Sequence, residues 1–113
     1  MTNLARLLLD RADRHPDAAF GTVEEPRTLG TAVATAARLV GALSSAGIAP
    51  GDRVALVGSS STSYLLAWAG LQLAGAEAAL VNPAYPDAML GELLARLAPR
   101  AVVLSDRAGG AFT

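Results

Sequence analysis

Residues 53–86 constrain the fold most, because the sequence there reads as a strand, a helix and a second strand in direct succession. A short apolar run ended by glycine is typical of a buried strand, and a longer apolar run stopped by Gly75 is typical of a helix. The three elements are predicted over Arg53–Gly58, Tyr64–Ala74 and Ala78–Val81. Between the first two lie five consecutive hydroxyl residues, Ser59–Ser63, which can cap the helix. Pro83 and Pro86 close the unit, since proline interrupts both helices and strands.

Helices and strands continue to alternate on both sides of this unit. Upstream, the pattern predicts a helix capped by Asn3, two short strands and a second helix, over about 3–14, 18–23, 27–29 and 30–46. Downstream, it predicts a helix over Asp87–Leu97, capped by Asp87, a strand over Ala101–Leu104 and a frayed tail over 105–113. This alternation indicates an α/β fold with a parallel sheet of three or more strands and flanking helices.

The spacing of apolar residues also predicts which face of each helix points inward. The inner faces are expected at Leu4, Leu7 and Leu8 in the first helix, at Val33, Ala37, Val40 and Leu43 in the second, and at Leu90, Leu93, Leu94 and Leu97 in the last. The Tyr64–Ala74 helix is apolar on every side, and Tyr64, Trp68 and Leu71 share one of them. Because such a helix is normally buried on most sides, we expect something outside this chain to cover it.

Composition excludes several classes of function. A chain of 113 residues is one domain or part of one, and with no cysteine it has no disulfide or thiolate metal site. Its net charge of -1 argues against nucleic-acid binding, which a basic face normally supports. The absence of lysine excludes Schiff-base and P-loop lysine chemistry. Charged residues interrupt the N-terminal leucines and hydroxyl residues split the longest uncharged span, so we expect neither a signal peptide nor a membrane span but a cytoplasmic protein.

The turn at Gly58–Ser63 is the one candidate phosphate site, and the pattern favours a helix cap there, because the glycines and lysine of a P-loop are missing. The same turn could hold a nucleophilic serine at Ser60. A nucleophile elbow, however, needs a second glycine where Thr62 stands, and a triad would need the only histidine, His15. We therefore read the turn as structural and His15 as a surface residue, since no second histidine or cysteine could join it on a metal.

Three other groups of residues could suggest chemistry, and for each a structural role is the better interpretation. Glu24 and Glu25 precede a proline, which indicates a solvated bend. Asp52 and Arg53 form a charged step at the start of a strand. The aromatic residues of the Tyr64–Ala74 helix lack the neighbouring positive charge of a base-stacking surface and are assigned to the core. The sequence thus predicts no catalytic, cofactor-binding or metal-binding residue and leaves any substrate-binding residue unknown.

The order of these elements resembles the N-terminal part of the AMP-forming acyl-CoA synthetases, the superfamily that also contains peptide-synthetase adenylation domains. The resemblance extends from about Leu4 to Leu104. The segments that carry it are Leu7–Asp17, Arg27–Leu29, Ala46–Leu56, Leu65–Leu71, Leu73–Ala76 and Val81–Pro86. Residues 1–113 accordingly resemble a single partial domain, the start of the large N-terminal domain of these enzymes. The Val81-Asn82-Pro83 form favours acyl-CoA ligases, since peptide-synthetase domains more often have an acidic residue before that proline.

The resemblance implies an activity that uses ATP, magnesium and coenzyme A. A carboxylate is activated to an acyl-adenylate and then passed to coenzyme A, as in fatty acid metabolism. The family's phosphate loop, ribose-binding acid and catalytic lysine have no counterpart in this sequence, so the chain is expected to bind no cofactor and to be inactive alone. Its expected partner is the remainder of the enzyme or a second copy. A standalone interaction module, or half of a split enzyme, is the alternative.

Overall fold

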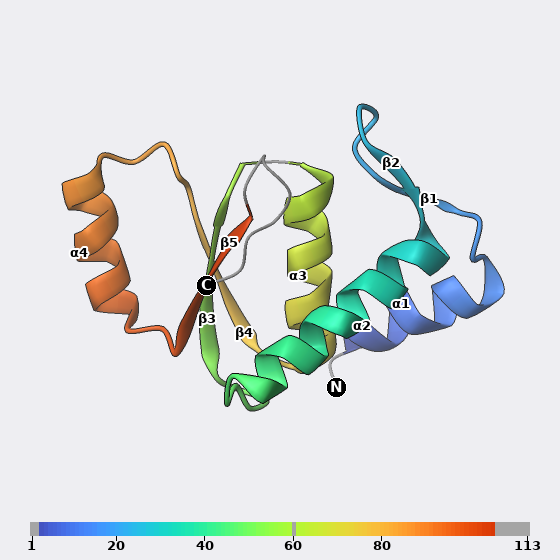
Figure 1. The fold of residues 1–113 in the computed structure, drawn as a ribbon, viewed down its shortest axis with the longest axis horizontal. Helices are drawn as coiled ribbons and strands as arrows, with labels where there is room; N and C mark the ends of the chain where they lie inside the picture. The colour runs from blue at the N-terminus through green and yellow to red at the C-terminus, as the bar shows by residue number, and fades with distance from the viewer. Residues whose placement is uncertain (1–2, 60, 106–113) are drawn as a thin grey trace.

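The computed structural model describes residues 3–59 and 61–105, in which helices and strands alternate along the chain (Figure 1). The described elements are α1 Asn3–Arg14, β1 Ala19–Gly21, β2 Pro26–Thr28, α2 Leu29–Ser45, β3 Arg53–Gly58, α3 Thr62–Ala74, β4 Glu77–Val81, α4 Asp87–Leu97 and β5 Ala101–Ser105. Each lies within two or three residues of its predicted bounds. The alternation arises because apolar runs are separated by Gly, Pro and hydroxyl residues, which end one element and begin the next.

A parallel sheet with the strand order β4-β3-β5 forms the centre of the fold, which confirms the predicted class. Val54 in the middle strand lies opposite Ala78 on one side and Ala101 on the other. The chain therefore crosses from β3 to β4 on one side and returns past β3 to β5. A separate antiparallel hairpin joins β1 to β2, with Phe20 opposite Arg27.

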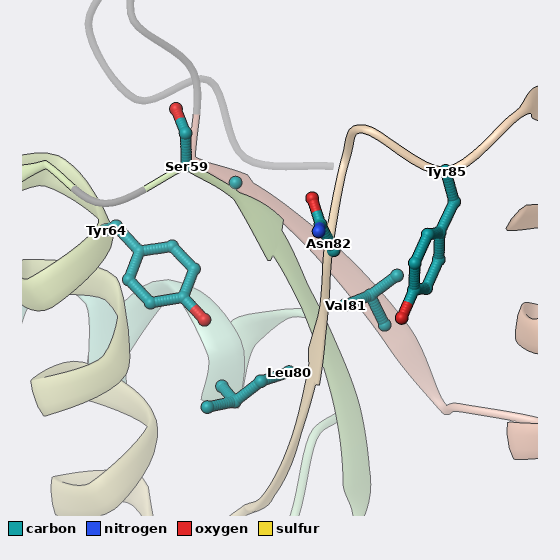
Figure 2. Close-up of a pocket in the computed structure, with 7 residues that line it drawn as sticks. Ser59, Tyr64, Leu80, Val81, Asn82 and Tyr85 are labelled. Carbon is teal, nitrogen blue, oxygen red and sulfur yellow. The ribbon is translucent and has the colours of Figure 1, made fainter.

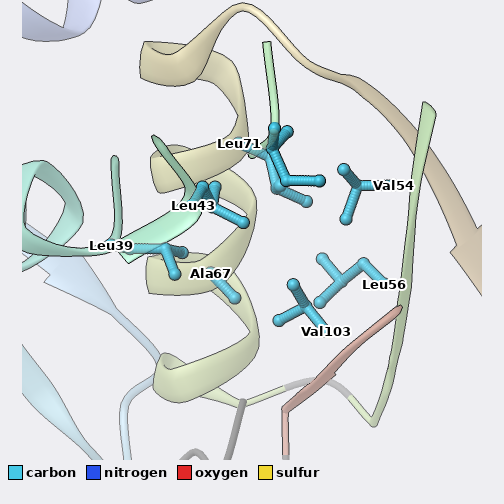
Figure 3. Close-up of a cluster of buried hydrophobic side chains, with 8 residues drawn as sticks. Leu39, Leu43, Val54, Leu56, Ala67, Leu71 and Val103 are labelled. Atoms are coloured by element: carbon cyan, nitrogen blue, oxygen red, sulfur yellow. The ribbon is translucent and has the colours of Figure 1, made fainter. Parts of the chain in front are cut away.

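Helices cover both faces of this sheet (Figure 1). On one face, Val54 and Leu56 pack against Ala67 and Leu71 of α3 and, beyond them, against α2 (Figure 3). On the other face, Ala55, Val57 and Val81 meet α4. The alternation of side chains along β3 sends successive residues to opposite faces, and Val54 to Val57 are all buried because both faces are covered.

The inward face of α4 is the predicted one. Its four leucines, at positions 90, 93, 94 and 97, pack against the second core cluster, although no residue of the helix is fully buried. The predicted cap is wrong, since Asp87 is already helical and the residue before it is Pro86, which makes no side-chain cap bond. Asp87 stabilises the first turn through its charge instead, because helix N-termini favour acidic side chains.

The inward face of α2 differs from the predicted stripe. Leu43 is buried as expected, but Ala37 is exposed, and Val33 and Val40 are only half-buried. The remaining buried residues of the helix are Leu29, Ala32, Ala36 and Leu39. Leu39 is buried at the close approach of α2 to α3, where Gly70 of α3 has no side chain and a Cβ atom would lie 2.5 Å from the Cδ2 atom of Leu39.

Alanines also replace leucines on the buried side of α1. Ala5 and Ala12 are buried, whereas Leu4 is 39% exposed, Leu7 is 64% exposed and Leu8 is half-buried. The predicted inner face of this helix is therefore wrong. The leucine-rich side of α1 lies on the surface of the described chain, which leaves apolar area in contact with water.

The chain itself covers α3 in part, with five of its residues buried and the other eight half-buried, and the expectation that something outside the chain covers the rest stays a prediction. α3 lies between the sheet and α2, and no residue from Thr62 to Ala74 is exposed (Figure 3). Trp68 is half-buried against the main core cluster, as predicted for a core aromatic. Gly75 ends the helix in the left-handed conformation, with φ 73°, which glycine adopts at little cost.

The predicted frayed tail begins one residue too early, because Ser105 is the last residue of β5 and is buried. The rest of that prediction, at 106–113, lies outside the described residues. Asn3 is the first described residue and belongs to α1, but its side chain lies outside the described structure. The predicted cap at Asn3 therefore stays a prediction.

Candidate functional site

The carboxyl ends of β3 and β4 form the place in this fold where a ligand site is expected. β3 continues into α3 on one face of the sheet, whereas β4 continues towards α4 on the other face (Figure 1). The two connections diverge and leave space between them. In open α/β sheets, ligands bind in this kind of crevice, at the carboxyl ends of strands whose connections leave in opposite directions.

A pocket of about 460 Å³ occupies this position. The residues that line it come from the end of β3, from α3 and from the segment that follows β4; they are Gly58, Ser59, Tyr64, Leu80, Val81, Asn82 and Tyr85 (Figure 2). The side chains of Tyr64 and Leu80 lie on one side of the β4 segment, and those of Val81 and Tyr85 lie on the other. Among the described residues that line it, no side chain is charged.

Asn82 is held in one orientation at the mouth of the pocket. Its Oδ1 atom accepts a hydrogen bond from the backbone N–H of Ala84 at 2.9 Å. Because a backbone N–H can only donate, this bond assigns the oxygen of the side-chain amide and leaves the Nδ2 group as a donor. The Asn-Pro sequence therefore forms a turn that presents an NH₂ group beside the pocket.

Tyr64 contributes a second uncharged donor. Burial raises the pKa of its hydroxyl group above the ordinary value of 10.0, because the phenolate form loses hydration inside the protein. The hydroxyl therefore keeps its proton at neutral pH and can donate or accept a hydrogen bond. It is directed from α3 towards Leu80 (Figure 2).

Gly58 brings the backbone of β3 close to its neighbours at the same place. A Cβ atom at this position would lie 2.6 Å from the carbonyl oxygen of Ser105 and 3.0 Å from the Tyr64 ring. Any larger residue would therefore force β5 or the tyrosine to move. The Oγ atom of Ser105 is buried and has no hydrogen-bond partner in the described structure.

The hydroxyl-rich turn behaves as the predicted helix cap. The Ser61 side chain accepts a hydrogen bond from the backbone N–H of Tyr64 at 3.1 Å. The buried Thr62 hydroxyl donates to the carbonyl oxygen of Glu25 and accepts from the backbone N–H of Thr22 at 3.1 Å. Sequence reasoning grouped Thr62 with the cap and missed this role, in which it ties the β1–β2 hairpin to the start of α3.

The remaining candidates have the structural roles that were predicted for them. Asp52 accepts a hydrogen bond from the backbone N–H of Ala49 at 2.8 Å and closes a turn. Arg53 pairs with Glu77 at 3.0 Å and donates to the carbonyl oxygen of Leu97 at 2.9 Å, so it joins β3, β4 and the end of α4. Both side chains of the Glu24–Glu25 pair are exposed in a bend.

No hydrolase triad assembles around the described part of this turn. His15 is exposed and follows α1, and Figure 1 places the end of α1 well apart from the β3–α3 turn. The serine of that hypothesis, Ser60, lies outside the described residues. Within residues 3–59 and 61–105, no group of three or more His, Cys, Asp or Glu side chains could hold a metal ion. The helices of the same part of the chain are too short or too polar to cross a membrane.

Comparison with known families identifies the fold. The profile of the family described as AMP-binding enzyme matches residues 8–111. The chain belongs to the AMP-binding enzyme family. This confirms the resemblance drawn from the sequence, and it makes β3-α3-β4-α4-β5 part of an AMP-binding enzyme fold. No curated protein matches the chain.

Solved structures agree with this assignment. The N-terminal subdomain of Klebsiella oxytoca NpsA, in complex with 3-hydroxyanthranilyl-AMSN, superposes with a TM-score of 0.80 at 20% identity and covers 100% of this chain and 30% of that one. IdnL1 gives a TM-score of 0.81 at 18% identity, covering 96% and 26%. The artificially fused adenylation–PCP di-domain NpsA-ThdA, also from Klebsiella oxytoca, gives 0.80 at 19%, covering 97% and 21%.

This AMP-binding enzyme chain therefore spans less than a third of each of these structures. At these identities the likeness establishes the fold. That fold is an α/β sheet flanked by helices, and it corresponds to the N-terminal subdomain of the first of these structures.

Proposed function

We propose that this chain forms the first part of the N-terminal domain of an acyl-CoA ligase, which activates a carboxylate with ATP and then transfers the acyl group to coenzyme A. The family match over residues 8–111 carries the proposal. The Asn82-Pro83 turn favours the acyl-CoA ligases within the family, because peptide-synthetase domains more often have an acidic residue in place of this asparagine.

The residues that the structure describes do not fit a nucleoside triphosphate or its magnesium ion. At the β3–α3 turn, the side chains of Ser61 and Thr62 are already engaged in hydrogen bonds within the protein. The sequence has no lysine that could reach a phosphate. We therefore assign no step of the reaction to this chain, and its role is to build the sheet and the helices against which the catalytic segments of the family fold.

Complementation tests this role. The chain is produced together with a polypeptide that carries the phosphate loop, the ribose-binding acid and the catalytic lysine of the family. ATP–pyrophosphate exchange is then measured with a panel of carboxylic acids. We expect exchange only when both polypeptides are present, and thioester formation when coenzyme A is added.

The matched control is Leu56→Asp, which places a charge in the fully buried middle of the sheet and should abolish complementation. Exchange by the chain alone, or full activity of the second polypeptide without it, would overturn the proposal.

A docking module is the second candidate, and exposed apolar side chains favour it. Val23 is 94% exposed, Leu7 64%, Leu80 57% and Met89 51%. A net charge of -1 opposes association only weakly. In this second proposal the cytoplasmic chain associates with itself or with the partner that carries the rest of the fold, through its exposed apolar surfaces.

Light scattering coupled to size exclusion at micromolar concentration measures this association. We expect a mass above 11.4 kDa, and a shift towards the monomer when Leu7 and Leu80 are replaced by serine. A sharp monomer peak for the unaltered chain, together with no binding of a hydrophobic dye, would exclude self-association through these side chains.

A further inference from the structure

The pocket between the carboxyl ends of β3 and β4 has the chemistry of a binding site in its own right. We propose that it binds a small uncharged aromatic molecule that carries a carbonyl or carboxamide group. This inference concerns residues of this chain only and does not rest on the acyl-CoA ligase proposal.

Hydrogen-bond donors in the pocket define the polar part of the ligand. The Oδ1 atom of Asn82 is used by the backbone N–H of Ala84, so the Nδ2 group is the part of the amide that can serve a ligand. The Tyr64 hydroxyl is the second donor. Each of these uncharged donors is suited to a lone pair of a carbonyl oxygen.

The charge of the ligand follows from what lines the pocket. Among the described residues that line it, none has an ionisable group other than the two tyrosines. From these described residues a carboxylate or an amidinium would gain no counter-charge, so burial of either group against them is costly. A neutral carbonyl loses much less hydration, so the pocket discriminates in its favour.

Apolar walls define the rest of the ligand. Leu80 is 57% exposed although it lies beside the Tyr64 ring, so a ligand that covers it removes apolar area from water (Figure 2). The Tyr64 ring favours an aromatic partner, because aromatic rings gain from offset or edge-to-face contact. Tyr85, which is 40% exposed, adds a second aromatic side chain to the lining on the other side of β4 (Figure 2).

A set of nearly isosteric probes tests the proposal on the intact chain. Benzamide, benzoate and benzamidine share one shape and carry neutral, negative and positive groups, and toluene lacks the carbonyl. Titrations are followed by amide shifts in two-dimensional NMR. We expect benzamide to bind with a dissociation constant on the order of 1–10 mM, as suits a ligand of its size, and to shift the amides of Gly58, Ser59 and Asn82.

Benzoate, benzamidine and toluene should each bind at least about tenfold more weakly, which corresponds to about 1.4 kcal/mol. Asn82→Asp keeps the acceptor for the Ala84 N–H but removes the donor, and Tyr64→Phe removes the hydroxyl. Each should weaken benzamide binding about fivefold or more. Ser44→Ala, at an exposed position on α2, is the matched control and should leave it unchanged.

Three results would overturn the proposal. They are the absence of saturable shifts up to about 50 mM benzamide, binding of benzoate or benzamidine as strong as that of benzamide, and equal binding of toluene. The last result would identify an apolar docking surface for a protein side chain. If Asn82→Asp does not fold, Tyr64→Phe decides the question alone, since unchanged affinity in that variant removes the donor argument.

Discussion

Gly70→Ala is the substitution whose effect follows most directly from the packing of α2 on α3. A Cβ atom at position 70 would lie 2.5 Å from the Cδ2 atom of Leu39 and 3.0 Å from its Cβ and Cγ atoms. The methyl end of Leu39 can turn aside, but its Cβ is fixed to the backbone of α2. The two helices must therefore separate, or Leu39 must leave its preferred rotamer within the core.

Two effects of opposite sign determine how much Gly70→Ala changes the free energy of unfolding. Overpacking of a core typically costs about 1–3 kcal/mol. Replacement of glycine by alanine inside a helix stabilises the folded state by about 1 kcal/mol, because the unfolded chain loses conformational freedom. We expect the net loss in the free energy of unfolding to be about 1 kcal/mol.

Gly41→Ala is the matched control, because it makes the same chemical change within α2. No atom lies within 4 Å of a Cβ at position 41, and the residue is exposed. Only the helix-propensity gain of about 0.5–1 kcal/mol applies there. Urea denaturation should therefore separate the two variants by about 2 kcal/mol, with unchanged m-values.

A second background tests the cause of the loss. When Leu39 is already alanine, Gly70→Ala should no longer destabilise the protein and should gain up to about 1 kcal/mol. If Gly70→Ala stabilises the original chain as much as Gly41→Ala does, α2 does not cross α3 at this distance and the described packing of the main core is incorrect.

Three further substitutions test other contacts. Thr62→Val should lower the free energy of unfolding by about 1–3 kcal/mol in urea denaturation, because Thr22 N–H and the Glu25 carbonyl lose their partner, whereas Thr62→Ser should retain most of the stability. Burial raises the pKa of Tyr64, so the folded state keeps a proton that the unfolded chain releases, and the free energy of unfolding falls as the pH rises above 10.0. Tyr64→Phe should remove this part of the loss. The measurement is the difference between the denaturation midpoints at about pH 7 and about pH 11. Trp68→Ala should lower the free energy of unfolding by about 3 kcal/mol, the lower end of the usual range for a buried tryptophan, because the ring is half-buried against the main core. A loss under about 1 kcal/mol in urea denaturation would contradict this packing.

Local sequence patterns were sufficient to predict the elements of the fold. The β3 strand and the ends of α3 are marked by glycine and hydroxyl residues, whose conformational and capping preferences act within a few residues of the chain. The parallel sheet follows from the alternation of strands and helices. Such signals are local, so no knowledge of distant contacts was needed.

Predicting which face of each helix is buried, by contrast, required knowledge of distant contacts. In α1 the pattern of leucines predicts burial at Leu7, yet Ala12 is buried and Leu7 is not. In α2 both Ala36 and Ala37 fit an apolar stripe, yet only Ala36 is buried, and the closest approach to α3 is made by Leu39 at Gly70. Hydrophobicity ranks leucine above alanine, but the distance between helices favours the smaller residue.

The candidate site was missed for a related reason. Asn82 and Tyr85 read as turn residues, and Tyr64 reads as core, so no motif connects them. They meet because β4 lies beside β3 while their connections leave on opposite faces. The sequence order of the strands carries a weak signal for such a crevice, but the spatial order β4-β3-β5 does not follow from it.

The unequal cover on the two faces of the sheet has a consequence for hydrogen exchange. α3 has five fully buried residues and is enclosed by α2, whereas α4 has none and rests on the sheet through half-buried leucines. Amide protons of α4 should therefore exchange through a local opening whose free energy is much lower than that of global unfolding. Amide protons of β3 and α3 should exchange only when the whole chain unfolds. Each such opening exposes Ala55 and Val57 for its duration, so the protein presents a second apolar surface to its surroundings, transiently, from a state that remains folded.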